Sequence, residues 1–201
     1  MAGQKAVFKN PFNFKIQKGF NLYYILTHSI FMYLIFALGI FSLISLLTSE
    51  PAEDATKSTN YLAWSIAIMG IIFVPLYLFL NSYMVTRRQA KESKGIIDYY
   101  EITKERIIKG DNSGAKKITL NWNNIDRVIE KEDVFYFFTT NDAAFIVSKE
   151  GAEGESALIL RQLVFANLKK KPKGKVPFKI KVKSYKEEQK LLKKAKKNDS
   201  K

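Results

Sequence analysis

The chain has 201 residues, with 33 Lys and Arg against 19 Asp and Glu, and a formal net charge of +14. It is 47% hydrophobic, yet its mean hydropathy is only −0.13, so the apolar and charged residues must lie in separate segments. Cys is absent, which excludes disulfides, thiolate metal sites and cysteine nucleophiles. The only histidine, His28, excludes zinc sites built on histidine pairs. We expect no cofactor and no metal.

The positive charge is concentrated at one end of the chain. Residues 169–201 hold 15 of the 33 basic residues and only 3 of the 19 acidic ones. Residues 95–168 are slightly acidic, with 9 basic and 12 acidic residues. An argument from high charge to nucleic acid therefore applies only to this basic tail.

Two long runs contain no Asp, Glu, Lys or Arg: residues 19–49 and residues 58–86. Each is longer than the roughly 20 apolar residues that cross a bilayer as a helix. Tyr23 and Tyr61 lie near their starts, and amphipathic rings favour the headgroup level. A buried helix of a soluble protein rarely continues that far without a charge. We therefore predict two transmembrane helices joined by the loop 50–57.

The basic residues predict the orientation of this hairpin. Residues 1–18 form a basic N-terminus, and Arg87 and Arg88 follow the second run. The loop 50–57 has one Lys and three acidic residues. Because basic flanks stay in the cytoplasm, we predict a multi-pass protein of the cell (cytoplasmic) membrane with both termini cytoplasmic and the loop outside.

Small residues predict how the two helices contact each other. Ala63, Ala67 and Gly70 lie on one stripe of the second run, and the first run offers Gly39 and Ser42. Such residues allow helix backbones to approach closely in a membrane. We expect a tight contact within the hairpin, although a homodimer through the spans would use the same residues.

Two further residues of the apolar runs, Pro75 and His28, predict specific structural features. Pro75 predicts a kink in the second helix, because proline removes a backbone hydrogen bond. His28 lies about one turn past Tyr24 and has no charged partner in either run. We interpret it as a structural histidine at the interface; the alternative is a proton relay.

Residues 95–168 predict a small α+β domain. Turn signals such as Asp111–Gly114 separate short segments rich in β-branched and aromatic residues, and residues 125–129 continue the apolar pattern. The predicted strands are 97–102, 105–109, 116–120, 134–139 and 143–148. Residues 155–168 have the apolar spacing of an amphipathic helix. We predict an antiparallel sheet with one face covered by this C-terminal helix.

Four stretches of this region carry a family resemblance: YYEIT at 99–103, LNWNNIDRV at 120–128, DVFYFF at 133–138 and AFIVSK at 144–149. They resemble the C-terminal domain of the YcxB-like family, small bacterial membrane proteins with two spans. The resemblance covers about residues 20–168 and implies a pleckstrin-homology-like cytoplasmic domain. The family has no established reaction or ligand, so the resemblance implies no functional site.

Several residues of the domain are candidates for a site. We interpret Trp122 as a packing anchor at a sheet corner, with a ligand-stacking role as the alternative. Asp126, Glu130, Glu132 and Asp133 are close enough in sequence to suggest paired carboxylates. Because no histidine or cleft accompanies them, we predict a solvated strand edge rather than acid–base chemistry.

Basic and aromatic side chains suggest contacts beyond the domain. Lys109, Lys116 and Lys117 flank a turn at which pleckstrin-homology-like folds can bind anionic headgroups, although this domain is acidic overall. The aromatic run 135–138 alternates between two faces of a strand. One pair should be core, and the other pair is left for the helix, a partner or headgroups.

The tail, residues 169–201, has three competing interpretations and one intramolecular variant. It is a solvated, disordered segment, it lies on the anionic lipid headgroups of the cytoplasmic leaflet, or it grips ribosomal or other RNA without reading its sequence. In the variant, it packs against its own acidic domain. The pattern alternates over 175–183, and a short helix is predicted from Ser184 to about Lys197. The candidate lipid or RNA contacts are Lys169, Lys170, Lys171, Lys173, Lys175, Lys179, Lys181, Lys183, Lys193, Lys194, Lys196 and Lys197.

Together these features predict a non-enzymatic integral membrane protein that presents a cytoplasmic binding or scaffolding domain to an unknown protein partner. Its fold class is a membrane α-hairpin plus a small α+β domain of pleckstrin-homology-like type. A membrane tether for ribosomes or other RNA is the first alternative. An accessory subunit of a membrane enzyme or transporter, which borrows catalytic groups from a partner, is the second.

Overall fold

The computed structural model describes residues 5–48, 57–114, 117–140, 143–170 and 175–185. The chain divides into two compact units. One is an α+β domain assembled from Met1–Ile16 and Ser93–Lys201, and the other is a helical hairpin formed by Gln17–Glu92. The hairpin is thus inserted into the sequence of the domain.

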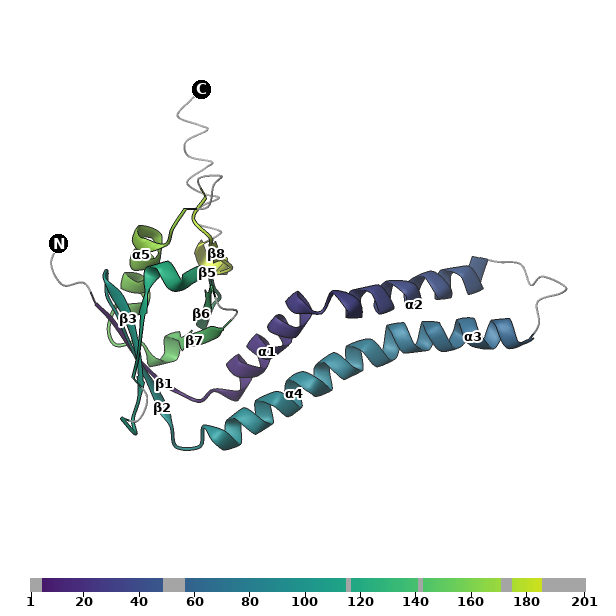
Figure 1. The fold of residues 1–201 in the computed structure, drawn as a ribbon, viewed down its shortest axis with the longest axis horizontal. Helices are drawn as coiled ribbons and strands as arrows, with labels where there is room; N and C mark the ends of the chain where they lie inside the picture. The colour runs from purple at the N-terminus through teal and green to yellow at the C-terminus, as the bar shows by residue number, and fades with distance from the viewer. Residues whose placement is uncertain (1–4, 49–56, 115–116, 141–142, 171–174, 186–201) are drawn as a thin grey trace, which may run out of the picture. The chain divides into compact units, whose positions relative to one another are not determined.

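The first sheet of the domain has four antiparallel strands in the order β1-β2-β3-β4 (Figure 1). They are β1 (Ala6–Pro11), β2 (Ile97–Ile102), β3 (Arg106–Asp111) and β4 (Ile118–Asn121). The three strands that the sequence predicts in this part of the chain are confirmed to within a few residues. A short 3-10 turn, η2 (Trp122–Asn124), leads from β4 into the second sheet.

Strand β1 is not predicted from the sequence, which we read as part of a basic N-terminal segment. It joins the sheet because its alternate residues, Ala6 and Phe8, are fully buried in the core. The Val7 N–H donates to Ser156 Oγ at 3.0 Å. A Cβ added to Gly151 would overlap the Lys9 carbonyl oxygen, so β1 passes so close to residue 151 that only glycine fits there.

The second sheet has the order β7-β6-β5-β8. Its strands are β5 (Ile125–Glu130), β6 (Val134–Thr139), β7 (Ala144–Ser148) and β8 (Phe178–Ile180). β5, β6 and β7 pair antiparallel, whereas β8 comes from the tail and pairs parallel to β5. β6 and β7 are predicted as strands, but β5 is seen in the sequence only as an apolar pattern. The prediction of one antiparallel sheet is therefore wrong: the strands form two sheets, and one of them contains a parallel pair.

The core of the domain lies between these sheets and helix α5 (Ser156–Asn167), which follows the 3-10 turn η3 (Lys149–Gly151). The helix contributes Leu160 and Val164, both fully buried. The rings of Phe137 and Phe145 stack with their centroids 4.7 Å apart. The predicted C-terminal helix is confirmed, and the sheet faces supply the apolar surface that it buries.

The hairpin consists of α1 (Phe14–His28), α2 (Ile30–Thr48), α3 (Lys57–Ile68), a π-helical turn η1 (Met69–Phe73) and α4 (Val74–Glu92) (Figure 1). Helix α1 begins in the domain segment and continues into the hairpin. Two helical stretches, Ile30–Thr48 and Asn60–Glu92, are long and apolar enough to cross a membrane. They overlap the two uncharged runs of the sequence, but the helix of the first run is interrupted at Ser29 and that of the second continues past residue 86 to Glu92.

The two arms of the hairpin touch at the predicted small residues. A Cβ added to Gly39 would lie 2.7 Å from the Cα of Gly70, closer than real Cβ atoms come to another atom. Ser42 Oγ donates to the carbonyl oxygen of Ala63 at 2.8 Å. The expected close contact within the hairpin is therefore confirmed, and side chains larger than hydrogen have no room at its centre.

Pro75 is accommodated by the π-helical turn that precedes it. The N–H of Val74 donates to the carbonyl oxygen of Met69, five residues earlier. Proline has no N–H, and in a regular helix its ring collides with the carbonyl of the residue four positions earlier. The wider π turn, a known site of helix distortion, thus takes up the irregularity that the sequence predicts.

A buried polar cluster lies where α1 packs against α4. Asn21 Nδ2 donates to Thr86 Oγ1 at 2.9 Å and to Gln89 Oε1 at 2.8 Å. Ser82 Oγ donates to the Lys18 carbonyl oxygen at 3.0 Å. Ser82 and Thr86 are fully buried. These hydrogen bonds satisfy polar groups that would otherwise be costly to bury.

His28 makes only local contacts among the described residues. Its ring stacks on that of Tyr24 with centroids 4.2 Å apart, and Nδ1 lies 2.9 Å from the Tyr24 carbonyl oxygen. Helix α1 ends at this residue, and Ser29 separates it from α2. These contacts fit a structural histidine at a helix end.

Candidate functional site

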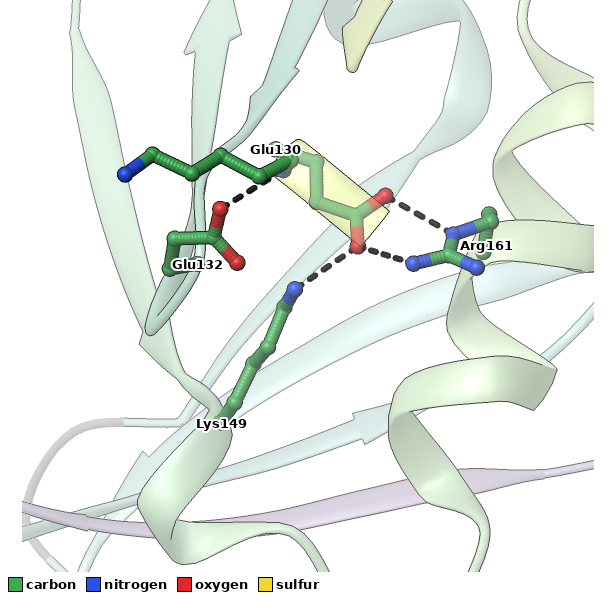
Figure 2. Close-up of polar contacts among 5 residues, drawn as sticks. Glu130, Glu132, Lys149 and Arg161 are labelled. Atoms are coloured by element: carbon green, nitrogen blue, oxygen red, sulfur yellow. Dashed lines mark hydrogen bonds and ion pairs between the residues drawn. The ribbon is translucent and has the colours of Figure 1, made fainter. Parts of the chain in front are cut away.

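A buried ion cluster occupies the end of β5. The side chain of Glu130 is fully buried and accepts hydrogen bonds from two cations (Figure 2). Arg161 of α5 reaches both carboxylate oxygens, with Nε 2.9 Å from Oε2 and Nη2 2.5 Å from Oε1. Lys149, just after β7, donates to Oε1 at 2.7 Å. One carboxylate thus joins β5, β7 and the closing helix.

This arrangement is chemically closed. The two-pronged Arg161 contact and the Lys149 ammonium occupy the carboxylate oxygens of Glu130, and they bring more positive than negative charge. A fully buried carboxylate with both oxygens bonded to cations of its own domain is a structural ion. Among the described residues no three His, Asp or Glu side chains come together as a metal site.

The prediction that Glu130 lies on a solvated strand edge is wrong. Glu130 is two residues beyond Val128, which is fully buried, so both side chains point to the same face of β5. The spacing of Val128 and Glu130 in the sequence already indicates that they share a face. The two cationic partners of Glu130 lie on other elements, so the sequence does not indicate them. Asp126, Glu132 and Asp133 are exposed, as predicted.

The tail segment 175–185 packs against the same end of β5. The Val128 N–H donates to the Pro177 carbonyl oxygen at 3.0 Å, and the Lys181 N–H donates to the Glu130 carbonyl oxygen at 2.8 Å. The Lys183 N–H then donates to Glu132 Oε1 at 2.6 Å (Figure 2). These contacts are those of the intramolecular variant, in which the tail lies against its own acidic domain.

Side chains of the tail alternate between the domain and the solvent. Val182 is buried, and Phe178 meets Phe165 of α5 edge-to-face with centroids 4.9 Å apart. The Tyr185 ring lies 5.4 Å from the guanidinium of Arg161, at the ion cluster. The alternation predicted for 175–183 is therefore present, with the apolar edge turned to the domain.

The structure places some of the twelve candidate lysines and not others. Lys169, Lys170, Lys175, Lys179, Lys181 and Lys183 are exposed. The remaining six, and nearly all of the predicted helix after Ser184, lie outside the described residues. They are Lys171, Lys173, Lys193, Lys194, Lys196 and Lys197. Of the first six, Lys179 lies in the strand β8, and Lys181 and Lys183 follow it.

The aromatic run of β6 is closed off from external partners. All four of its side chains, Phe135, Tyr136, Phe137 and Phe138, are buried. The outer pair is covered by cations of the domain: Lys131 Nζ lies 4.9 Å from the Tyr136 ring, and the Arg127 guanidinium 4.4 Å from that of Phe138. The idea that this pair meets a partner or headgroups is therefore wrong.

Burial also shifts proton affinities around β6. Burial, and then the nearby charge of Asp133, raises the pKa of Tyr136 to about 12. Burial lowers the pKa of Lys131, and the charge of Lys181 lowers it further. In both cases the neutral form is favoured because the charged form loses hydration. Lys131 and Lys181 thus bring two cations together where the tail meets the domain.

Two other candidates have structural partners. Trp122 is buried, and its Nε1–H donates to the Thr103 carbonyl oxygen at 2.9 Å, which makes it the packing anchor that we predict. Lys109 forms an ion pair with Asp98 at 3.0 Å. Lys117 is exposed, and Lys116 lies outside the described residues. The turn therefore offers fewer unpaired cations to headgroups than its sequence suggests.

Comparison with known proteins gives one match. Residues 102–164, from the end of β2 into α5, match the family model described as YcxB-like protein. This part of the chain is similar to that family. No curated protein and no solved structure matches the chain. The match covers most of the strands that carry the resemblance in the sequence, as well as Glu130 and both of its partners.

Proposed function

We propose that this protein is a non-enzymatic integral membrane protein whose hairpin crosses the cell membrane. In this proposal its YcxB-like domain lies at the cytoplasmic face and acts as a binding or scaffolding module. Two four-stranded sheets, antiparallel except for the β5–β8 pair, and the helix α5 support a pleckstrin-homology-like fold for that domain. Its buried carboxylate is paired with two cations of the same domain, which supports a binding role rather than catalysis.

The exposed apolar surface of the hairpin carries this proposal. Ile30, Phe41 and Leu47 of α2 are 75%, 72% and 72% exposed, and Leu62 of α3 is 63% exposed. In the most apolar 18-residue stretch of Ile30–Thr48 only 6% is buried, and in that of Asn60–Glu92 only 22% is buried. A core helix of a soluble protein would bury this surface, and contiguous apolar surface of this extent is costly in water. Lipid is the solvent that such a surface fits.

The basic tail is the second part of the proposal. Lys175, Lys179, Lys181 and Lys183 are exposed on a tail segment that the domain holds in place through the pairing of β8 with β5. Near an anionic leaflet each such lysine contributes on the order of 1 kcal/mol. We propose that these lysines, with the other candidate lysines of the tail, hold the domain close to anionic lipid headgroups.

Insertion and orientation are tested together with single cysteines, because the chain has none of its own. Asp54→Cys marks the connecting loop and Ser184→Cys marks the tail. In intact cells a membrane-impermeant maleimide should label only Asp54→Cys, and in inverted vesicles only Ser184→Cys. Both proteins should resist carbonate extraction. Release by carbonate, or labelling of both positions from one side, would refute the hairpin.

Lipid contact is tested with the full chain in nanodiscs. A dye on Ser184→Cys should transfer energy to a lipid-bound acceptor more efficiently in anionic than in neutral discs. The difference should vanish between about 0.1 M and about 1 M salt, as the screening length falls from roughly 10 Å to roughly 3 Å. Changing Lys175, Lys179, Lys181 and Lys183 to Gln should weaken it. Equal transfer in both discs would reject lipid contact, and RNase-sensitive co-sedimentation with ribosomes would favour an RNA tether.

A further inference from the structure

The outer edge of β5 is a surface to which an extended chain already binds. β5 pairs with β6 on one side and with the tail strand β8 on the other. The ladder to β8 spans three residue pairs, Val128 with Phe178, Ile129 with Lys179, and Glu130 with Ile180. The unpaired edge of a sheet is a template for strand addition by another segment of chain. Here the tail of the same chain fills it.

The tail strand is attached to the domain differently from β1, the other strand that lies far away in the sequence. β1 contributes Ala6 and Phe8, both fully buried, and pairs with β2 over six residues. β8 contributes Phe178 and Ile180, which are only partly buried and lie at the margin of the core. β8 thus packs against the margin of the core, whereas β1 contributes fully buried residues to its interior.

We propose that the β5 edge, consisting of the backbone of Val128–Glu130 with the side chains of Glu132, Arg161 and Phe165, is a peptide-binding site. Its partner is an extended segment with apolar side chains at alternate positions. Segment 176–185 of the tail is an exchangeable occupant that fills the site in cis. Displacement of this segment opens the site to the partner.

The seated tail shows which features such a partner needs. Its main chain provides an acceptor for the Val128 N–H and a donor for the Glu130 carbonyl oxygen. Strand addition of this kind gains affinity from the main chain and specificity from alternate side chains. An aromatic ring is placed against Phe165, as Phe178 is, and a second ring in the helical turn that follows the strand is placed against Arg161, as Tyr185 is.

The test uses the tail peptide itself, KVPFKIKVKSY (residues 175–185), carrying a fluorophore. Binding is measured by anisotropy to the chain in neutral nanodiscs at high salt, so that charge attraction to lipid is absent. A chain truncated after Leu168 should bind the peptide at least about tenfold more tightly than the intact chain, because the tail no longer competes. A peptide of the same composition without the alternation is the matched control and should not bind.

Two further variants keep the test decisive. In the truncated chain Phe165→Ala, at a side chain that is 45% exposed, should weaken peptide binding several-fold while the domain stays folded. In the intact chain Val182→Asp should release the tail and allow binding without truncation. The fluorescence of Trp122, which is buried in the folded domain, shows whether each variant is folded.

Three outcomes would overturn the proposal. The truncated chain stays folded but does not bind the peptide, or the intact and truncated chains bind it equally, or both truncation and Val182→Asp unfold the domain. In the last case β8 is an integral strand and not an exchangeable one. None of these outcomes depends on whether the hairpin crosses a membrane, so failure here is separate from failure of the proposed function.

Discussion

The α+β domain and the helical hairpin bury opposite kinds of residue. The domain hides its large side chains, with Phe8, Phe135 and Phe137 fully buried, and its buried carboxylate Glu130 is paired with cations. The hairpin buries small and polar residues such as Gly70 and Thr86 and leaves most of its Ile, Leu and Phe outside. The hydrophobic effect stabilises the first pattern in water. The second pattern is not stabilised in this way and relies on close backbone contact and hydrogen bonds between helices.

The largest expected effect tests the internal charges of the domain. Glu130→Ala leaves Arg161 and Lys149 without their shared partner, and breaking a buried pair in this way costs about 3–5 kcal/mol. The measurement is urea unfolding of the full chain in detergent, followed by Trp122 fluorescence in a Trp64→Phe background. Glu105→Ala, at an exposed turn residue, is the control and should change stability by less than about 0.5 kcal/mol. Equal midpoints for the two variants would mean that the cluster contributes no stability.

The next prediction concerns the aromatic interior of the domain and alkaline pH. The folded-state pKa of Tyr136, raised to about 12, lies above the unfolded value near 10. The folded form therefore holds its proton more tightly, so stability is full below about pH 10 and falls as pH rises towards 12. The loss from Tyr136 reaches roughly 2.7 kcal/mol for a two-unit shift.

Tyr136→Phe has no phenol to ionise and should remove this part of the alkaline loss. Burial, with a contribution from Asp98, also raises the pKa of Tyr100, so some alkaline loss should remain in the variant. The lowered pKa of Lys131 acts in the opposite direction, because the unfolded chain then holds the extra proton. The measurement is the difference between wild type and Tyr136→Phe in unfolding free energy from pH 9 to 12. A difference that does not change with pH contradicts the assignment.

A third prediction tests close contact in the hairpin. Gly39→Leu inserts a side chain where even a Cβ would lie 2.7 Å from Gly70, and overpacking of this kind costs about 1–3 kcal/mol. Oxidative crosslinking of Ser42→Cys with Ala63→Cys should proceed in the wild-type background and fall sharply with Gly39→Leu. Leu38→Val, at a side chain that faces outwards, should leave the crosslink unchanged. Unchanged crosslinking with Gly39→Leu would show that packing of the two arms does not depend on the contact between Gly39 and Gly70.

The smallest expected effect is at the exposed end of α4. Arg88 Nε and Glu92 Oε1 lie 2.9 Å apart, but both side chains are largely in solvent. Exposed pairs one helical turn apart contribute about 0.3–0.5 kcal/mol. Glu92→Gln should therefore lower thermal stability only marginally, and the effect should shrink further at high salt. A loss of stability comparable to that of Glu130→Ala would mean that this ion pair is buried in the functional protein.

The sequence predicts well wherever the signal is local. The uncharged runs, the Gly39 and Gly70 contact, the strands β2, β3, β4, β6 and β7 and the C-terminal helix each follow from composition or periodicity within one short segment. Trp122 belongs to the same group, because a large apolar residue at a strand end is usually an anchor. Strand β1 and the burial of Glu130 were missed, since each depends on a partner far along the chain.

The sequence alone therefore determined the two apolar helices, the α+β character of the domain and the concentration of charge in the tail. These properties follow from the apolar and charged residues that each segment contains. Only the tertiary structure decided that the N-terminus completes the first sheet, that Glu130 is an internal ion and that the tail closes the β5 edge. The physical reason is the same for all three features. Backbone hydrogen bonds and buried ion pairs form between segments that are distant in the sequence, and the sequence of one segment does not indicate its partner.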